Sequence, residues 1–220
     1  MGTGKQLQLT AEEQAQVERA VVAAERHTNA EIVPMVVARS GVYRDARYQA
    51  GSLFALVVLT VLLTGNTLWL PWDWHASNAA WLIQAALLAY GFGGWLGTLG
   101  PIIRLLTPTE RMLEKVRFRA ERAFAQHAVS QTRERTGVLI MVSLLERQIY
   151  VLPDQLLFQR IPVEEWARVV QGAVDRLKMG DLVGGLCQAI EACGALLQDV
   201  CPGRPHDNPN ELPNRLLQEP

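Results

Sequence analysis

Two long runs without charged side chains are the most prominent feature of the hydrophobic pattern. They cover residues 48–70 and 79–103, and Asp73 is the only Asp, Glu, Lys or Arg in the whole stretch 48–103. The first run has 23 residues and would measure about 34 Å as a helix, enough to cross a hydrocarbon core of about 30 Å. The pattern therefore predicts a transmembrane helical hairpin; two buried helices of a soluble protein are the alternative.

Basic residues flank this hairpin on both sides, and its connecting turn has none. Three arginines lie within 39–47, and six Lys or Arg residues lie within 104–122. The positive-inside rule then places both termini in the cytoplasm and the chain in the cytoplasmic (inner) membrane. Tryptophan favours the headgroup region, so four tryptophans are expected to anchor the outer boundary in the bilayer. These anchors are Trp69, Trp72, Trp74 and Trp81.

Small residues recur at every fourth position of the second span. They are Ala85, Ala89, Gly93 and Gly97. Small side chains let two helix backbones approach closely in lipid, so this stripe is expected to pack against another helix. The favoured partner is the first span, through Gly51 and Ala55. The alternative is a second copy of the chain, which would make the protein a homo-oligomer.

Outside the hairpin, the hydrophobic pattern predicts helices that alternate with strands. Helices are expected over 10–27 and 107–131, with two more around the apolar stripes of 166–177 and 182–197. Strands are expected over 31–38, 137–145 and 148–152.

Single residues refine this pattern. Pro34 lacks a backbone donor, which indicates a sheet edge or a bulge. Glu146 and Arg147 can form the tight turn of a β-hairpin. The five prolines of 202–220 predict an extended tail.

The order of these elements predicts one α/β domain that the hairpin interrupts. A right-handed strand–helix–strand crossover would place the strands at 31–38 and 137–145 parallel in one sheet. Residues 1–47 and 104–201 would then be the two parts of this domain, and 202–220 a proline-rich tail. A separate N-terminal arm is the alternative, but one helix and one strand are too few to bury a core.

Charge and cysteine content exclude several classes of protein. Residues 1–47 carry six basic and six acidic side chains, and residues 104–220 carry fifteen of each. This balance gives no net positive field, so no nucleic-acid partner is expected. The three cysteines, Cys187, Cys193 and Cys201, form no CxxC pair, which argues against a disulfide scaffold or a thiolate metal site. Buried cysteines in a reducing compartment are expected.

Catalytic motifs are absent from the sequence. It contains no G-x-S-x-G, P-loop, HExxH or Rossmann glycine pattern, and Ser143 has no obvious base near it in sequence. Three segments are informative: the first helix and strand ending in "TNAEIVPMVV", then "RTGVLIMVSLLERQIYVLPD", and then "GDLVGGLCQAI". Together they resemble the TPM domain family, most closely its bacterial branch with two central spans. The resemblance implies an α/β/α sandwich with a small mixed sheet.

The resemblance also implies two functions to weigh. The family includes metal-binding and phosphatase-like members, whose acidic residues lie just before the glycine that opens the central strand. Here Arg135 and Thr136 precede that glycine, and Glu134, Asp154 and Asp181 remain as candidate ligands for a divalent cation such as calcium. The simpler interpretation is that Asp181 caps a helix and Asp154 makes a turn.

The favoured hypothesis assigns no catalytic residue and no cofactor. It describes a membrane-anchored, cytoplasmic domain that binds a membrane or cytoplasmic protein or supports the assembly of a complex. The alternative is a metal-dependent phosphatase, which rests on the family resemblance.

Overall fold

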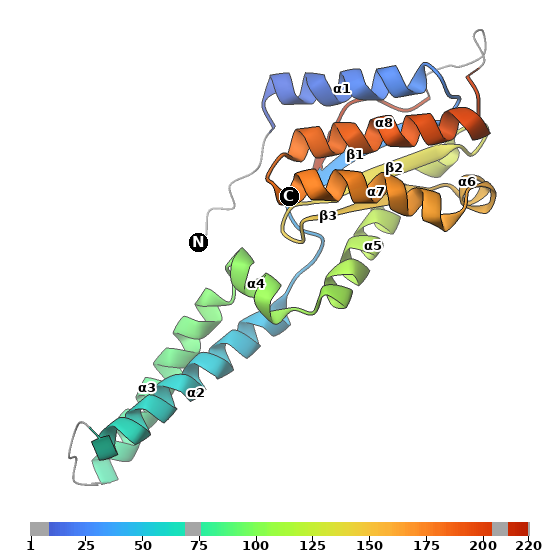
Figure 1. The fold of residues 1–220 in the computed structure, drawn as a ribbon. Coiled ribbons are helices and arrows are strands. Elements are labelled where there is room, and N and C mark those ends of the chain that lie inside the picture. Colours follow the sequence, from blue (N-terminus) through green and yellow to red (C-terminus); the bar gives the residue numbers. More distant parts are fainter. Residues whose placement is uncertain (1–8, 69–75, 204–210, 220) are drawn as a thin grey trace. The chain divides into compact units, whose positions relative to one another are not determined.

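A computed structural model describes residues 9–68, 76–203 and 211–219 (Figure 1). Contacts divide the chain into two units, one formed by Met1–Gly41 with Leu113–Pro220, and the other by Val42–Met112. The predicted anchors Trp69, Trp72 and Trp74 lie outside the described residues. The first unit is the α/β domain, and the second holds the long apolar helices.

The α/β domain is built on a four-stranded mixed sheet in the order β3-β2-β1-β4. Strands β1 (Glu31–Val37) and β2 (Gly137–Ser143) pair parallel, and β2 pairs antiparallel with β3 (Gln148–Pro153). The predicted parallel pair and hairpin are therefore both confirmed. Because β2 starts after the inserted helices, the sheet joins segments from both ends of the chain.

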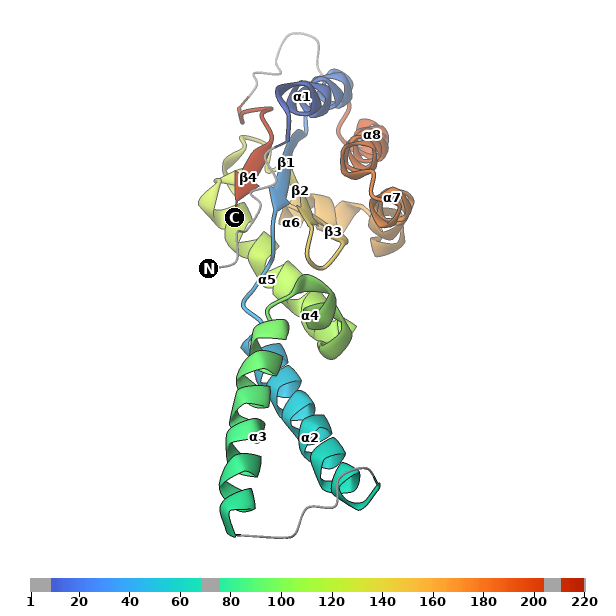
Figure 2. The same cartoon turned by 90° about the vertical axis from the view of Figure 1, so that its left-hand side faces the viewer.

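Helices cover both faces of this sheet (Figure 2). Helices α1 (Ala11–Glu25), α7 (Val163–Lys178) and α8 (Leu182–Val200) share a core with Ile32 and Ile140 on one face. Helix α5 (Thr109–Gln126) packs on the other face against Met35 and Met141. Successive strand residues thus enter opposite cores, which explains why β1 and β2 read as unbroken apolar runs. The predicted α/β/α sandwich with a small mixed sheet is confirmed.

Three helical segments differ from the prediction. Helix α5 ends at Gln126 rather than near residue 131, because Ala128 takes a left-handed conformation (φ 53°) before a 3-10 turn, Val129–Gln131. Helix α6 (Gln155–Arg160), a helix of six residues after β3, was not predicted. The second apolar run, predicted as one helix to residue 103, is broken by a turn after Leu96.

The break in the second apolar run has a local cause. Helix α3 (Ala76–Leu96) stops, and a separate helix α4 (Gly100–Leu106) begins with Pro101 in its first turn. A proline inside a helix has no N–H and its ring clashes with the carbonyl four residues earlier, here that of Gly97. The uncharged run therefore forms two helices.

The predicted small-residue stripe lies where α3 packs against α2 (Arg44–Leu68). A β carbon on Gly93 would stand 2.7 Å from the carbonyl oxygen of Ala50, and one on Gly97 would stand 2.8 Å from the Cα of Arg47. Ala89 is buried as well. Both glycines therefore permit α3 to approach α2 of the same chain closely. The first span was the favoured of the two partners considered from the sequence.

The tail contains a strand that the sequence did not predict. Strand β4 (Leu217–Glu219) pairs parallel with Met35–Val37 of β1. The N–H of Ala38 donates to the carbonyl of Glu219 at 3.1 Å, so alternate N–H positions of β1, including that of Pro34, face this edge. Pro34 has no N–H to offer and lies just before the pairing begins. The expectation of an edge at Pro34 therefore holds for the first half of β1.

Candidate functional site

Asp154 is the most unusual of the three carboxylates selected from the sequence. It follows β3, its N–H donates to the carbonyl of Gly137 at 2.9 Å, and the residue is 4% exposed. It occupies the N-cap position of α6, but its side chain makes no capping hydrogen bond. Its Oδ2 is buried without a hydrogen-bond partner among the described residues. A buried carboxylate oxygen in this state is costly, so the group is chemically available to a cation or a donor.

Glu134 lies near the same end of the sheet as Asp154. It is exposed, and its charge acts on Cys201, the residue that ends α8. Cys201 also receives a hydrogen bond from Arg160, the last residue of α6, and α6 begins after Asp154. Glu134 and Asp154 thus share one region of the domain.

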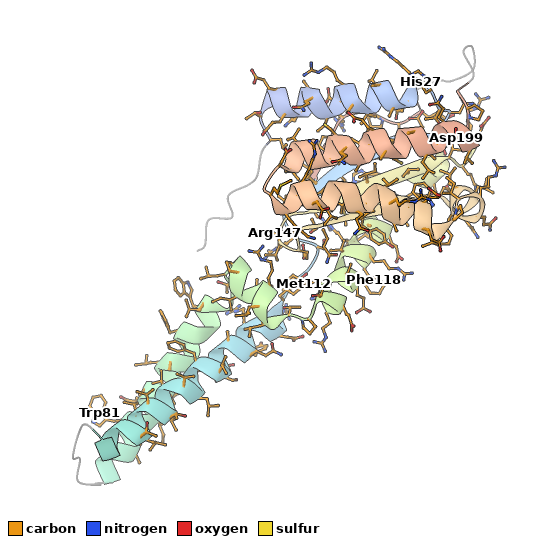
Figure 3. All side chains as sticks on the ribbon, in the orientation of Figure 1. His27, Trp81, Met112, Phe118, Arg147 and Asp199 are labelled. Carbon is orange, nitrogen blue, oxygen red and sulfur yellow. The ribbon has the colours of Figure 1, made fainter. Side chains whose placement is uncertain are left out.

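Asp181 lies at the other end of α8. Its carboxylate accepts a hydrogen bond from the N–H of Gly184 at 2.8 Å, so the predicted helix cap is confirmed. Helix α8 has 19 residues, which separates Asp181 from Cys201 by about 28 Å. His27 and Asp199 mark the end of the α1 and α8 layer that is remote from Asp181 (Figure 3). The structure therefore does not bring the three carboxylates together.

No cation site built from three side chains is found within the described ranges. There, no group of three His, Cys, Asp or Glu residues has the arrangement of a metal site. The three cysteines are buried and free, and burial raises the pKa of the Cys193 thiol to about 12. A thiol with so high a pKa is protonated at neutral pH and is a poor nucleophile or ligand.

Glu146, which the sequence indicated only as a turn residue, is a buried carboxylate at the opposite end of β2. Glu146 is 6% exposed and accepts hydrogen bonds from the hydroxyl of Ser143 and from the N–H of Ser40 at 3.1 Å. The hydroxyl of Ser40 donates to Ser143 Oγ at 2.7 Å. Ser143 therefore does have a carboxylate beside it. These bonds join the β2–β3 turn to the segment through which the chain leaves β1.

Two further carboxylates hold the tail beside the edge of β1 that pairs with β4: Glu31, the first residue of β1, and Glu25, the last residue of α1. The carboxylate of Glu31, 5% exposed, accepts hydrogen bonds from the N–H groups of Glu211 at 3.2 Å and Leu212 at 3.3 Å. The carboxylate of Glu25 accepts one from the N–H of Ile32 at 3.0 Å and another from the side chain of Asn214. Both are therefore acceptors for backbone or amide donors.

Burial makes these two carboxylates weaker acids than usual. The pKa of Glu25 is raised to about 7, chiefly by desolvation and to a smaller extent by the neighbouring charge of Glu31. Desolvation also raises the pKa of Glu31. Hydrogen bonds to each group offset part of this effect. The tail thus covers two acids whose charged forms are disfavoured where they stand.

Two nitrogen-bearing side chains contact the far end of the tail: Arg119 lies on α5, and His127 directly follows the last residue of that helix. Arg119 and His127 both contact the carboxylate of Glu219, His127 through Nε2 at 3.2 Å. All three side chains are less than a third exposed. The tail segment 211–219 is therefore held at its start by Glu31, in its middle by Glu25 and at its end by this pair. We call the surface formed by these four residues of the domain the tail clamp.

The tail clamp could hardly be predicted from the sequence. Its members come from α1, β1, α5 and the residue after α5, and none of them belongs to a recognisable motif. One signal was present: Glu31 is a charged residue at the start of a strand that is otherwise buried on both faces. Such a residue needs a partner, and the partner lies 180 residues away.

The fold defines an α/β/α sandwich whose sheet is completed by segments from before and after an inserted pair of apolar helices. The TPM domain model matches residues 105–196, which run from α4 into α8. The chain therefore carries a TPM domain. Helix α1 and strand β1 lie outside the matched residues, although β1 is central to the sheet.

The fold is similar to that of a solved structure. It is the NMR structure of the BA42 protein from the psychrophilic bacterium Bizionia argentinensis, with a TM-score of 0.60 and 18% sequence identity over 100% of both chains. At this identity the similarity concerns the fold alone. The comparison with curated proteins finds no match.

Proposed function

We propose that this protein is a TPM-domain protein of the bacterial two-span type, anchored in the cytoplasmic membrane, whose domain binds another protein on the cytoplasmic side. The observation that carries the anchor is the exposure of the apolar helices. Two segments are long and apolar enough to span a membrane, Arg44–Thr64 and Ala79–Leu96. Only 17% of the first and 11% of the second is buried in the structure. A soluble protein would bury such helices, so lipid is the solvent that suits them.

The arrangement of the charges supports the orientation. The described end of α2 carries Arg44 and Arg47, and α4 carries Arg104, so the basic residues lie at one end of the helical pair. Trp81 lies at the other end, near the start of α3, and its side chain is 68% exposed (Figure 3). An exposed indole at that position suits the headgroup region.

Cysteine labelling in intact cells tests the orientation. Cysteines introduced at Asp73 and at Glu12 should differ in their accessibility to an impermeant maleimide. The cysteine at position 73 should be labelled in intact cells, and the cysteine at position 12 should be labelled only after lysis. The native cysteines are buried, so they should add little background. Labelling of position 12 in intact cells would reverse the proposed orientation.

The binding role rests on the tail clamp. A sheet edge that holds an extended segment through carboxylate acceptors and through Arg119 and His127 is the kind of surface on which one protein adds a strand to another. Crosslinking in cells, followed by purification of the full-length protein, should recover a defined protein partner. The matched control is the Arg119→Glu variant, which keeps both spans and changes the clamp. Identical recovery by the two proteins, or recovery of none, would argue against a binding role for this surface.

A metal-dependent phosphatase is the second candidate, and the buried, unpartnered Oδ2 of Asp154 favours it. Purified protein would be titrated with calcium, magnesium and manganese and assayed on a phosphomonoester. Asp154→Asn should abolish any metal-dependent signal, and Asp181→Asn, at the far end of α8, is the control. Turnover that survives Asp154→Asn, or no metal binding at all, would remove this candidate.

A further inference from the structure

The main-chain pairing between the tail and β1 is short. Strand β4 has three residues, and Pro34 removes the donor that would extend the ladder toward the start of β1. The next available donor on this edge, the N–H of Ile32, is taken by Glu25 rather than by the tail. Few main-chain hydrogen bonds therefore connect the tail to β1, and the side chains of the tail clamp supply much of the remaining attachment.

The tail clamp contacts features that many extended peptides share. Glu31 accepts two consecutive main-chain N–H groups, which any residue except proline can supply. Leu216 and Leu217 pack into the cores on the two faces of the sheet. Only the far end of the tail clamp selects for a negative charge, because Arg119 and His127 contact a carboxylate there. The surface thus selects an extended segment with adjacent apolar residues followed by an acid.

The chain's own tail satisfies this surface incompletely. Arg119 Nε and Asn214 Oδ1 are both buried and lack a hydrogen-bond partner within the part of the chain that the structure describes. The tail also covers Glu25 and Glu31, two neighbouring acids whose burial disfavours their charged forms. The buried Arg119 Nε and Asn214 Oδ1 weaken docking of the tail, so a segment that supplies a partner to Arg119 Nε and buries no such amide oxygen can compete with the tail.

We propose that the edge of β1 is a strand-acceptor site for an extended peptide of a partner protein, and that residues 211–219 are its built-in competitor. The partner segment lies parallel to Met35–Val37, offers main-chain donors to Glu31, and places an acidic residue against Arg119 and His127. The inference rests on the proposed binding function and names the site and the chemistry of its ligand.

A charge-reversal experiment on the full-length protein tests this site. The probe is a fluorescent peptide with the sequence of residues 211–219, ELPNRLLQE, and the readout is fluorescence anisotropy. Glu219→Lys in the chain removes the tail's own carboxylate, so this variant should bind the peptide at least tenfold more tightly than the wild type does. Arg215→Gln, at an exposed tail position, is the matched control and should behave as the wild type does.

The complementary pair makes the test specific. A peptide carrying the Glu219→Lys change should not bind the Glu219→Lys chain, but it should bind the Arg119→Glu chain. Circular dichroism of each variant reports whether the domain is folded. A folded Glu219→Lys chain that takes up no peptide, or equal uptake of both peptides by all chains, would overturn the proposal. A mixed dimer of the Glu219→Lys and Arg119→Glu chains would also overturn it, because the occupant would then be a second copy.

The two proposals fail separately. If the peptide does not bind but crosslinking recovers a partner, then the partner binds elsewhere and only the strand-acceptor site is lost. If the peptide binds and no partner is recovered in cells, the site exists and the proposed binding function is lost.

Discussion

Gly137 and Val129 lie so close together that a β carbon at position 137 would stand 2.1 Å from the carbonyl oxygen of Val129. The obstacle is main chain, which cannot rotate away as a side chain can. Gly137 opens β2, so any larger residue must push the 3-10 turn away from the sheet. Glycine is required here by a close approach rather than by its own backbone angles.

Gly137→Ala should therefore destabilise the domain by about 1–3 kcal/mol, the usual cost of overpacking. The free energy of unfolding in urea measures it. Gly172→Ala is the control: its β carbon would meet only the end of the Gln188 side chain, and alanine favours a helix. If both variants unfold at the wild-type midpoint, the contact with Val129 is not rigid.

Gly93→Leu should separate α2 from α3. A β carbon at this position would stand 2.6 Å from the Cβ of Phe54, and main chain blocks it as well. The thermal midpoint in detergent should fall by several degrees. Gly91→Leu is the control, because nothing lies within 4 Å of a β carbon there. Equal loss in both variants would mean that a bulky residue is disfavoured anywhere on α3, and packing against α2 would not be the cause.

Ser143→Ala should leave the buried Glu146 carboxylate with one fewer donor. Loss of a hydrogen bond to a buried charged group costs on the order of 1–3 kcal/mol. Chemical unfolding should show this loss, whereas Ser130→Ala, in the 3-10 turn, should show little. Glu146→Gln should be destabilising too, since an amide would present a donor to the N–H of Ser40. A neutral Ser143→Ala would mean that water replaces the hydroxyl.

Stability should depend on pH through Glu25. Its pKa is raised from 4.5 to about 7 in the folded protein, so the folded state binds more protons than the unfolded state between these values. The contribution of Glu25 to stability is complete below pH 4.5 and is lost as pH rises through about 7. The loss amounts to at most about 3 kcal/mol.

Glu25→Gln should flatten this part of the stability curve, and Glu12→Gln, exposed on the first turn of α1, should not. Urea midpoints measured at half-unit pH steps between 5 and 8 test this. A curve that is unchanged by Glu25→Gln would mean that the carboxylate is better solvated than its position suggests.

Local signals made most of the fold predictable. Two-sided burial gave β1 and β2 unbroken apolar runs. The T-x-x-E pattern of Thr10 and Glu13 is typical of a capping box, and both of its hydrogen bonds are present at the start of α1. Asp181 was predicted as a cap for the same reason, because its acceptor role depends on residues three positions away. The right-handed crossover rule then fixed the parallel pairing.

The features that escaped prediction depend on distant residues. Strand β4 has three residues in a proline-rich tail, and only its pairing with β1 makes it a strand. Glu146 lies three positions from Ser143, but Ser40 lies 106 positions from Glu146, so the complete network could not be identified from neighbouring residues. Likewise, the separation of Asp181 from Asp154 and Glu134 could be predicted only with knowledge of the direction in which α8 runs. The run 79–103 was predicted as one span, although the missing N–H of Pro101 favours a break there.

Because the apolar helices interrupt the α/β domain, they set the order in which its strands can pair during synthesis. Strand β1 leaves the ribosome before the apolar helices, and its partner β2 follows only after both helices have been made. The edge of β1 must therefore stay unpaired while α2 and α3 are made, and β4 reaches it last of all. With the membrane anchor proposed above, insertion of α2 and α3 would precede closure of the sheet, and a chain that fails to insert would leave the edge of β1 open.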